Sequence, residues 1–278
     1  MRIERGNPSG SESPARRQEG PEIHNETAVV NGRGESPEKA TQVVKPETKT
    51  PARIRKDIIY APSTGKPVDQ NIVNFTYYNS FNYSLLSKDR SNLRLTLGVT
   101  SPNGGEGKTV VAANLAVSLT LGFQKKAVLV DLNIQRPRLN EVFNVPCNPG
   151  LLDALRNGSV NVAWTPLENL AVLPSGSARD RRSNGEPASR QSLVGLEYMS
   201  SFGQVVRSLE EEFEFVIVDM PSINSRNFPI LFANQLDGLI VVVDTTRTRR
   251  EDVEKLFRQV NEKQVLGFVF NRVRDDDN

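Results

Sequence analysis

Residues 99–116 read VTSPNGGEGKTVVAANLA, a glycine-rich loop that follows one apolar stretch and opens a longer one. Gly107, Lys108 and Thr109 match the end of the phosphate-binding pattern GxxxxGK[ST], whereas Pro102 stands at the position of its first glycine. Glycine lets a backbone approach an anion closely, and the amino end of a helix offers free N–H groups to it. The residues predicted to hold phosphate are Gly104, Gly105, Glu106, Gly107, Lys108 and Thr109. A glycine turn that only links a strand to a helix is the alternative interpretation.

Short apolar runs alternate with amphipathic stretches from residue 93 onward. Such runs are typical of strands buried on both faces, in a parallel sheet that helices cover. The predicted strands are LRLTLGV (93–99), KAVLVDL (126–132), ENLAVLP (168–174), FEFVIVD (213–219), LDGLIVVVD (236–244) and QVLGFVF (264–270). Helices are expected over 109–121, after Pro137, over 197–212 and over 250–263, the last with a stripe of Val253, Leu256, Phe257 and Val260. We therefore predict an α/β, three-layer P-loop NTPase fold, with a mostly parallel sheet and helices on both faces.

Two aspartates end predicted strands of this sheet. The helix after the loop, about 20 Å long, can cross the sheet, so we expect strand 126–132 close to strand 93–99. Asp131 and Asp219 then emerge at the carboxyl edge of the sheet, where ligands of open α/β sheets bind. Either aspartate alone could be a turn residue or a helix cap. Together with Lys108 and Thr109 they predict a nucleotide site.

The chain is expected to have three parts. Residues 1–56 are polar and show no helical or strand period, which predicts a disordered N-terminal segment. Residues 57–92 turn mildly apolar and aromatic and are expected to form an ordered lead-in to the main domain. Residues 93–278 are expected to form the P-loop nucleotide-binding domain. The lone histidine, His24, lies in the first part.

Charge and cysteine content narrow the function classes. Lys plus Arg number 35 and Asp plus Glu 33, so the net charge of +2 gives no strong field toward nucleic acid, and no nucleic-acid partner is expected. The single cysteine, Cys147, excludes an internal disulfide and fits a reducing compartment. Apolar runs stay below the roughly 18 residues that span a bilayer. We expect a cytoplasmic protein without direct membrane insertion. The basic segment 177–190 is expected to be a solvated loop or a partner contact.

The stretches VTSPNGGEGKT, AVLVDLNIQRP, EFVIVDMPS, LIVVVD and VLGFVFNRV, in this order, resemble the bacterial tyrosine kinases of capsular and exopolysaccharide biosynthesis. These are cytoplasmic P-loop proteins related to the MinD and ParA ATPases. The resemblance covers residues 93–273. Asn103 stands where MinD and ParA loops carry a lysine, and Arg136 with Pro137 is a kinase-like pair after the second strand.

The resemblance implies roles for the site residues. Lys108 and Thr109 would hold the β- and γ-phosphates of ATP and Mg²⁺, Asp131 would be the base for a tyrosine hydroxyl, and Asp219 would belong to the metal shell. Asp131 would also lie near the metal. Asn271 would meet the nucleotide base, although a lone Asn is also a common turn residue. A membrane-bound polysaccharide co-polymerase-like partner is implied too, which would hold the chain peripherally at the inner face of the membrane, and so is a homo-oligomer.

Three features depart from that family pattern. Asn133 stands where the second strand usually adds another aspartate, which removes one negative charge near Mg²⁺. The tail NRVRDDDN has no tyrosine cluster, and no Glu and Arg repeat is recognisable in residues 77–94. Tyr77, Tyr78 and Tyr83 are the alternative acceptors, or an aromatic packing cluster. The sequence thus leaves three functions open: a tyrosine kinase, a nucleotide-gated regulator of polysaccharide export, and a ParA/MinD-like ATPase.

Overall fold

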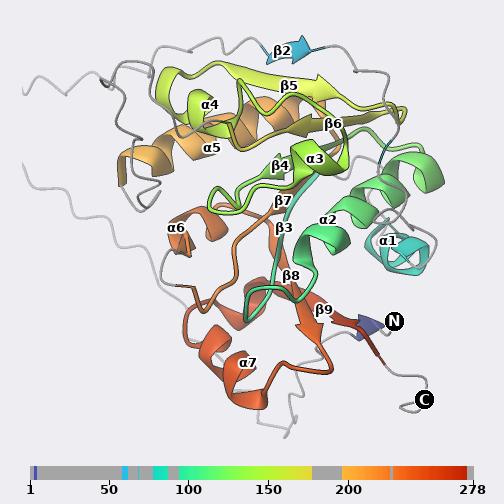
Figure 1. The fold of residues 1–278 in the computed structure, drawn as a ribbon, viewed down its shortest axis with the longest axis vertical. Coiled ribbons are helices and arrows are strands. Elements are labelled where there is room, and N and C mark those ends of the chain that lie inside the picture. Colours follow the sequence, from blue (N-terminus) through green and yellow to red (C-terminus); the bar gives the residue numbers. More distant parts are fainter. Residues whose placement is uncertain are drawn as a thin grey trace, which may run out of the picture. The chain divides into compact units, whose positions relative to one another are not determined.

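The computed structural model describes residues 3–4, 58–61, 68, 78–86, 94–176, 196–225 and 228–273 (Figure 1). The chain divides into two units, one of Met1–Gly6 with Lys56–Asn278 and one of Asn7–Arg55. The second unit lies outside the described residues, as do His24, Tyr77, the basic segment 177–190 and the tail 274–278. The segment 1–56, expected to be disordered, therefore lies outside them too, apart from Ile3–Glu4.

One sheet of nine strands organises the described residues. Its strands are β1 (Ile3–Glu4), β2 (Ile58–Ala61), β3 (Leu95–Thr100), β4 (Ala127–Asp131), β5 (Val160–Trp164), β6 (Leu170–Leu173), β7 (Phe215–Asp219), β8 (Gly238–Asp244) and β9 (Val265–Asn271). They lie in the order β1-β9-β8-β3-β7-β4-β6-β5-β2. Pairing is parallel from β9 through β6, whereas β5 runs antiparallel to β6 and β1 antiparallel to β9. The mostly parallel sheet is as predicted.

All six predicted strands are present, as β3, β4, β6, β7, β8 and β9. The sequence analysis did not predict β1, β2 or β5. β1 and β2 are short edge strands that form only against a neighbour, with Ile3 opposite Val269 and Ile58 opposite Val160. Edge strands of this length carry little apolar patterning of their own, so sequence gives a weak signal for them.

The helices are α1 (Asn79–Leu86), α2 (Lys108–Val117), α3 (Leu139–Val142), α4 (Leu151–Asn157), α5 (Leu196–Glu212), α6 (Ile230–Ala233) and α7 (Arg250–Phe257). A π-helical turn, Ser118–Gly122, prolongs α2 to the length that the sequence predicted. α7 is shorter than the expected helix 250–263. The α-helix ends at Phe257, and a 3₁₀ turn, Glu262–Gln264, leads into β9. Val260, between the two, is buried although it lies outside the helix.

Two apolar cores flank the sheet, because successive strand residues point to opposite faces. Val216 and Val218 of β7 face one core, which α4, α5, α6 and α7 cover. Phe215 and Ile217 face the other, which α1, α2 and α3 cover. Figure 1 shows α2 and α5 on opposite sides of the central strands. The molecule thus has the three layers that were predicted.

β4 lies one strand away from β3, because β7 is inserted between them and pairs with both. The sequence predicted β4 close to β3 but not the strand that separates them. β7 can take this place because all five of its residues are buried and both of its backbone edges are available for pairing. The insertion sets Asp131 opposite Asp219 in the register of β4 and β7.

Candidate nucleotide-binding site

The glycine loop connects the end of β3 to the start of α2, as in phosphate-binding loops. Gly105 and Gly107 have φ angles of +82° and +95°, the left-handed region that favours glycine. At Gly107 a Cβ atom would also lie 2.3 Å from Nδ2 of Asn271. Both glycines are therefore required by the shape of the loop. α2 begins directly afterwards at Lys108, so its free N–H groups face the loop.

The first half of the loop is attached to the chain after β7. Ile223 donates its backbone N–H to the carbonyl of Ser101 at 2.9 Å, and Asn224 donates to the carbonyl of Pro102 at 3.1 Å. The Thr100 hydroxyl donates to the carbonyl of Pro221 at 2.8 Å. These bonds hold the loop against the segment that follows Asp219.

Lys108 and Thr109 lie at the start of α2, beside the two strand-end aspartates. The Thr109 hydroxyl donates a hydrogen bond of 2.7 Å to Oδ2 of Asp219. Lys108 is 8% exposed, and its positive charge acts on both Asp131 and Asp219. The structure thus brings together the four residues that the sequence singled out for phosphate and metal.

Both aspartates are fully buried, and their charges are poorly solvated. Burial raises the pKa of Asp219, and the neighbouring Asp131 raises it further, against the hydrogen bond from Thr109 and the charge of Lys108. Burial also raises the pKa of Asp131, which backbone N–H groups and Lys108 oppose. Two buried carboxylates at adjacent strand ends need positive charge nearby, and a bound cation would supply it.

The oxygen atoms of this site suit a hard cation. Oδ1 of Asp219 is buried without a hydrogen-bond partner among the described residues, and such an orphaned oxygen marks a place for a ligand or its water. The Thr109 hydroxyl lies beside the same carboxylate. Mg²⁺ in nucleotide sites is held by one or two protein oxygens together with phosphate and water. The residues present fit that ion.

Asp131 is largely engaged by the loop that follows it. Oδ1 accepts the backbone N–H of Asn133 at 3.1 Å, and Oδ2 accepts those of Arg138 and Leu139 at 3.0 and 3.1 Å. A carboxylate offers about four acceptor positions, so roughly one remains for another donor. Asn133 therefore acts on Asp131 through its backbone, whatever its side chain binds.

Asn271 lies at the end of β9, but its amide contacts the loop itself. Nδ2 donates to the carbonyl of Glu106 at 3.0 Å, and Oδ1 accepts the N–H of Arg272 at 3.0 Å. Gly104 has open space around it, and Glu106 is buried.

Sequence reasoning missed the chain after β8. Asp244 is the last residue of β8, as Asp131 and Asp219 are the last residues of β4 and β7. This shared position was the signal in the sequence that could have identified Asp244. Its carboxylate accepts hydrogen bonds from Thr246, Arg247 and Arg272.

Of the candidate acceptor tyrosines, two lie in the described part of the chain. Tyr78 is 6% exposed, and burial raises its pKa to about 12. Tyr83, on α1, is 67% exposed. α1 is attached to the far end of α2, where Ser118 donates to Asn79 at 2.6 Å and Asn82 donates to the carbonyl of Leu115 at 3.2 Å.

The loop, the sheet order and the paired aspartates define a P-loop nucleotide-binding protein. The chain belongs to the CobQ/CobB/MinD/ParA nucleotide binding domain family, whose model matches residues 97–278. Among the helices described here, none is long and apolar enough to cross a membrane.

Known relatives include bacterial tyrosine kinases. A putative tyrosine-protein kinase CapB of Staphylococcus aureus is 26% identical over 190 residues, 66% of this chain and 77% of that protein. The succinoglycan biosynthesis transport protein ExoP of Rhizobium meliloti is 26% identical over 183 residues, 63% of this chain but 22% of ExoP. The crystal structure of the chimerical protein CapA2B2 matches with a TM-score of 0.59 and 26% identity, over 71% of this chain and 84% of that one.

Proposed function

We propose that this chain is an ATP- and Mg²⁺-dependent protein tyrosine kinase of capsular or exopolysaccharide assembly. The observation that carries the proposal is the hydrogen bond between Thr109 and Asp219. It lies beside the buried Lys108, where the glycine loop meets α2. Proteins with this fold can have several activities, and the similarity to CapB supports a kinase activity for this chain. Fold alone does not select an activity, so the assignment depends on these residues.

Each site residue has a distinct task in this proposal. The loop Gly104, Gly105, Glu106 and Gly107 surrounds the phosphates with backbone N–H groups, and Lys108 contacts their terminal oxygens. Thr109 and Asp219 hold Mg²⁺, which neutralises phosphate charge when bound. Asp131 accepts the proton of the tyrosine hydroxyl through its remaining acceptor position. Phosphoryl transfer depends mainly on positioning and charge neutralisation, which this arrangement can supply.

We further propose that a membrane-bound polysaccharide co-polymerase-like protein is the partner and that it holds this chain at the inner face of the membrane. The similarity to ExoP, a biosynthesis transport protein that is much longer than this chain, supports such a pairing. A homo-oligomer belongs to the same proposal, because α1 with Tyr83 is attached to the end of α2 opposite the loop. Ten helical residues span about 15 Å, so Tyr83 would reach the site of another copy rather than its own.

A nucleotide-gated regulator without phosphoryl transfer is the second candidate. Two features favour it. Asn133 in place of an aspartate removes one negative charge near the metal, and the three backbone bonds stabilise the ionised Asp131 and so make it a weaker base. A ParA/MinD-like ATPase, the third candidate, is supported by the family match but not by Asn103.

One experiment separates these functions. The purified chain is incubated with Mg²⁺ and ATP labelled on the γ-phosphate, with and without the cytoplasmic part of the partner. Label on protein tyrosine supports the kinase, label released as inorganic phosphate alone supports the ATPase, and bound but unhydrolysed nucleotide supports the regulator. The kinase proposal is wrong if no label reaches protein in either condition.

A further inference from the structure

Glu106 is an unusual residue for a loop that receives a polyanion. Its side chain lies in the phosphate loop and is 2% exposed. Its carboxylate accepts the backbone N–H of Asn103 at 3.0 Å and the hydroxyl of Thr248 at 2.6 Å. The side-chain Nδ2 of Asn103 also donates to this carboxylate, at 3.4 Å from Oε1 of Glu106. These donors are neutral, and a buried carboxylate is costly unless it is well hydrogen-bonded. A buried carboxylate beside a phosphate site therefore needs a structural explanation.

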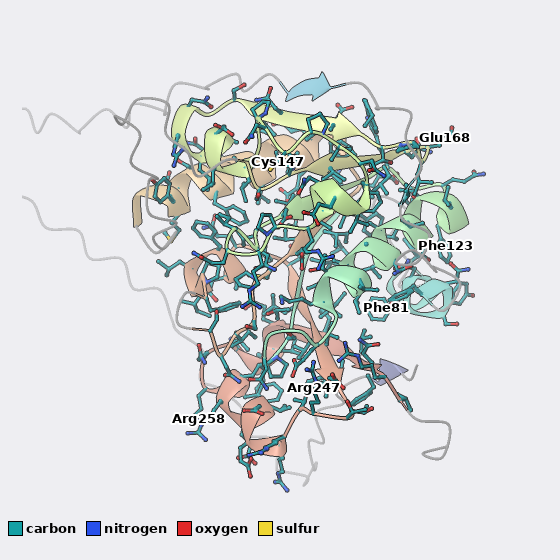
Figure 2. All side chains as sticks on the ribbon, viewed as in Figure 1. Phe81, Phe123, Cys147, Glu168, Arg247 and Arg258 are labelled. Atoms are coloured by element: carbon teal, nitrogen blue, oxygen red, sulfur yellow. The ribbon has the colours of Figure 1, made fainter. Side chains whose placement is uncertain are left out.

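The segment after β8, residues 244–248, contacts the loop at a second point. Nη2 of Arg247 donates to the carbonyl of Gly105 at 2.7 Å, while its Nε donates to Oδ2 of Asp244 at 2.9 Å. Thr248 is itself placed by the backbone N–H of Asp244, which donates to its hydroxyl oxygen at 3.0 Å. Figure 2 shows Arg247 beside the ends of β8 and β9. Asn271 of β9 supplies the third contact, to the carbonyl of Glu106.

These contacts determine which way the loop's N–H groups point. In a trans peptide the C=O and the next N–H lie on opposite sides of the same plane. Arg247 holds the carbonyl of Gly105 toward the β8–β9 side, so the N–H of Glu106 points away from it. Asn271 holds the carbonyl of Glu106 in the same way, so the N–H of Gly107 also points away. Successive N–H groups that point to one side form an anion-binding concavity.

We propose that Glu106, Arg247, Thr248 and Asn271 form a latch that sets the shape of the phosphate loop, and that they are positioning residues for nucleotide binding. This inference rests on the proposed nucleotide site. The bond between Glu106 and Thr248 connects residues 142 apart in the sequence, so the loop after β3 is held in shape by the segment that follows the neighbouring strand, β8. The role that the latch gives to Asn271 is to orient the loop.

The test compares variants that remove single latch bonds. Thr248→Val keeps the side-chain volume but deletes the hydroxyl, and we expect it to weaken binding of Mg-ADP about tenfold in calorimetry. Thr165→Val is the matched control, because the Thr165 hydroxyl also donates a hydrogen bond, to the carbonyl of Leu170 at 3.0 Å, but lies in the β5–β6 turn. The control should lower the melting temperature and leave nucleotide affinity unchanged.

Glu106 variants give an independent measurement. Glu106→Ala should bind Mg-ADP at least about tenfold more weakly than the parent. Glu106→Gln should stay within about threefold, because its amide oxygen can accept the N–H of Asn103 while its amide N–H donates to the hydroxyl oxygen of Thr248. In the double variant of Glu106→Ala and Thr248→Val the two losses should not add, because both remove the same bond. If Glu106→Ala does not fold, Thr248→Val still decides the matter.

The latch is wrong if Thr248→Val and, where it folds, Glu106→Ala bind Mg-ADP within twofold of the parent. That result would show that the loop backbone alone sets its shape. Failure of the parent protein to bind Mg-ADP would instead overturn the proposed nucleotide site. The two failures are therefore distinguishable.

Discussion

The hydroxyl of Thr109, at the start of α2, donates a hydrogen bond of 2.7 Å to the carboxylate of Asp219, the last residue of β7. The two residues are 110 positions apart in the sequence, and the bond joins the helix of the phosphate loop to the centre of the sheet. Because Asp219 is fully buried and keeps one oxygen unpartnered among the described residues, this pair is where a cation would be bound.

Lys108→Ala should weaken Mg-ATP binding by about a hundredfold, because the backbone N–H groups alone cannot neutralise a triphosphate. The measurement is titration calorimetry on the folded variant. Lys125→Ala is the charge-matched control, since the Lys125 amine pairs with Glu214 at 2.8 Å just before β4, at the opposite edge of the sheet. Equal affinity in Lys108→Ala and the parent would show that the nucleotide site lies elsewhere.

Asn133→Asp should raise the rate of phosphoryl transfer on the order of tenfold if the chain is a kinase, because it restores a negative charge near Mg²⁺. Single-turnover transfer from γ-labelled ATP measures the effect. Asn169→Asp adds the same charge before β6, at the other edge of the sheet, and should leave the rate unchanged. A regulator would instead show no transfer in the parent or in Asn133→Asp, even with the partner present, while nucleotide binding persists.

Tyr83→Phe should remove most self-phosphorylation, because Tyr83 is 67% exposed whereas Tyr78 is buried among apolar residues. Tyr78→Phe is the matched control and should leave the labelled site unchanged. Fragmentation of phosphopeptides assigns the position. The reaction should also accelerate with protein concentration, since Tyr83 lies beyond the far end of α2 from its own site. Undiminished label in Tyr83→Phe would move the acceptor to another tyrosine.

Asp244→Asn should destabilise the fold at pH 7, and its effect should shrink in acid. Although burial raises the pKa of Asp244, bonds from Thr246, Arg247 and Arg272 outweigh burial and lower it overall. A carboxyl with a lowered pKa stabilises the folded state above its unfolded pKa of about 3.9, and this stabilisation is lost as the pH falls through the folded pKa. Urea unfolding of parent and variant at pH 7 and pH 3 measures the difference. A difference that grows in acid would contradict this assignment.

Much of the fold could be read from local pattern. Six strands appeared as apolar runs of strand length, and all six are present. Five of them, all but β9, are buried on both faces, and such a strand needs apolar residues throughout. Lys108 and Thr109 were found because the phosphate loop is a continuous stretch whose function depends on neighbouring residues. The sequence analysis missed β1, β2 and β5. β1 and β2 are short edge strands, which depend on their partners more than on their own composition, and β5 is a short strand interrupted by the polar Asn161.

Strand order and the latch came only from the tertiary structure. Apolar strands of similar length could pair with one another in several orders. Nothing in residues 93–132 therefore showed that β7 would lie between β3 and β4. The bond between Thr248 and Glu106 spans 142 residues, and the one between Asn271 and Glu106 spans 165. Contacts at such separations arise when the packed sheet aligns the ends of its strands, and a polar residue at a strand end carries no local sign of which distant group it will meet.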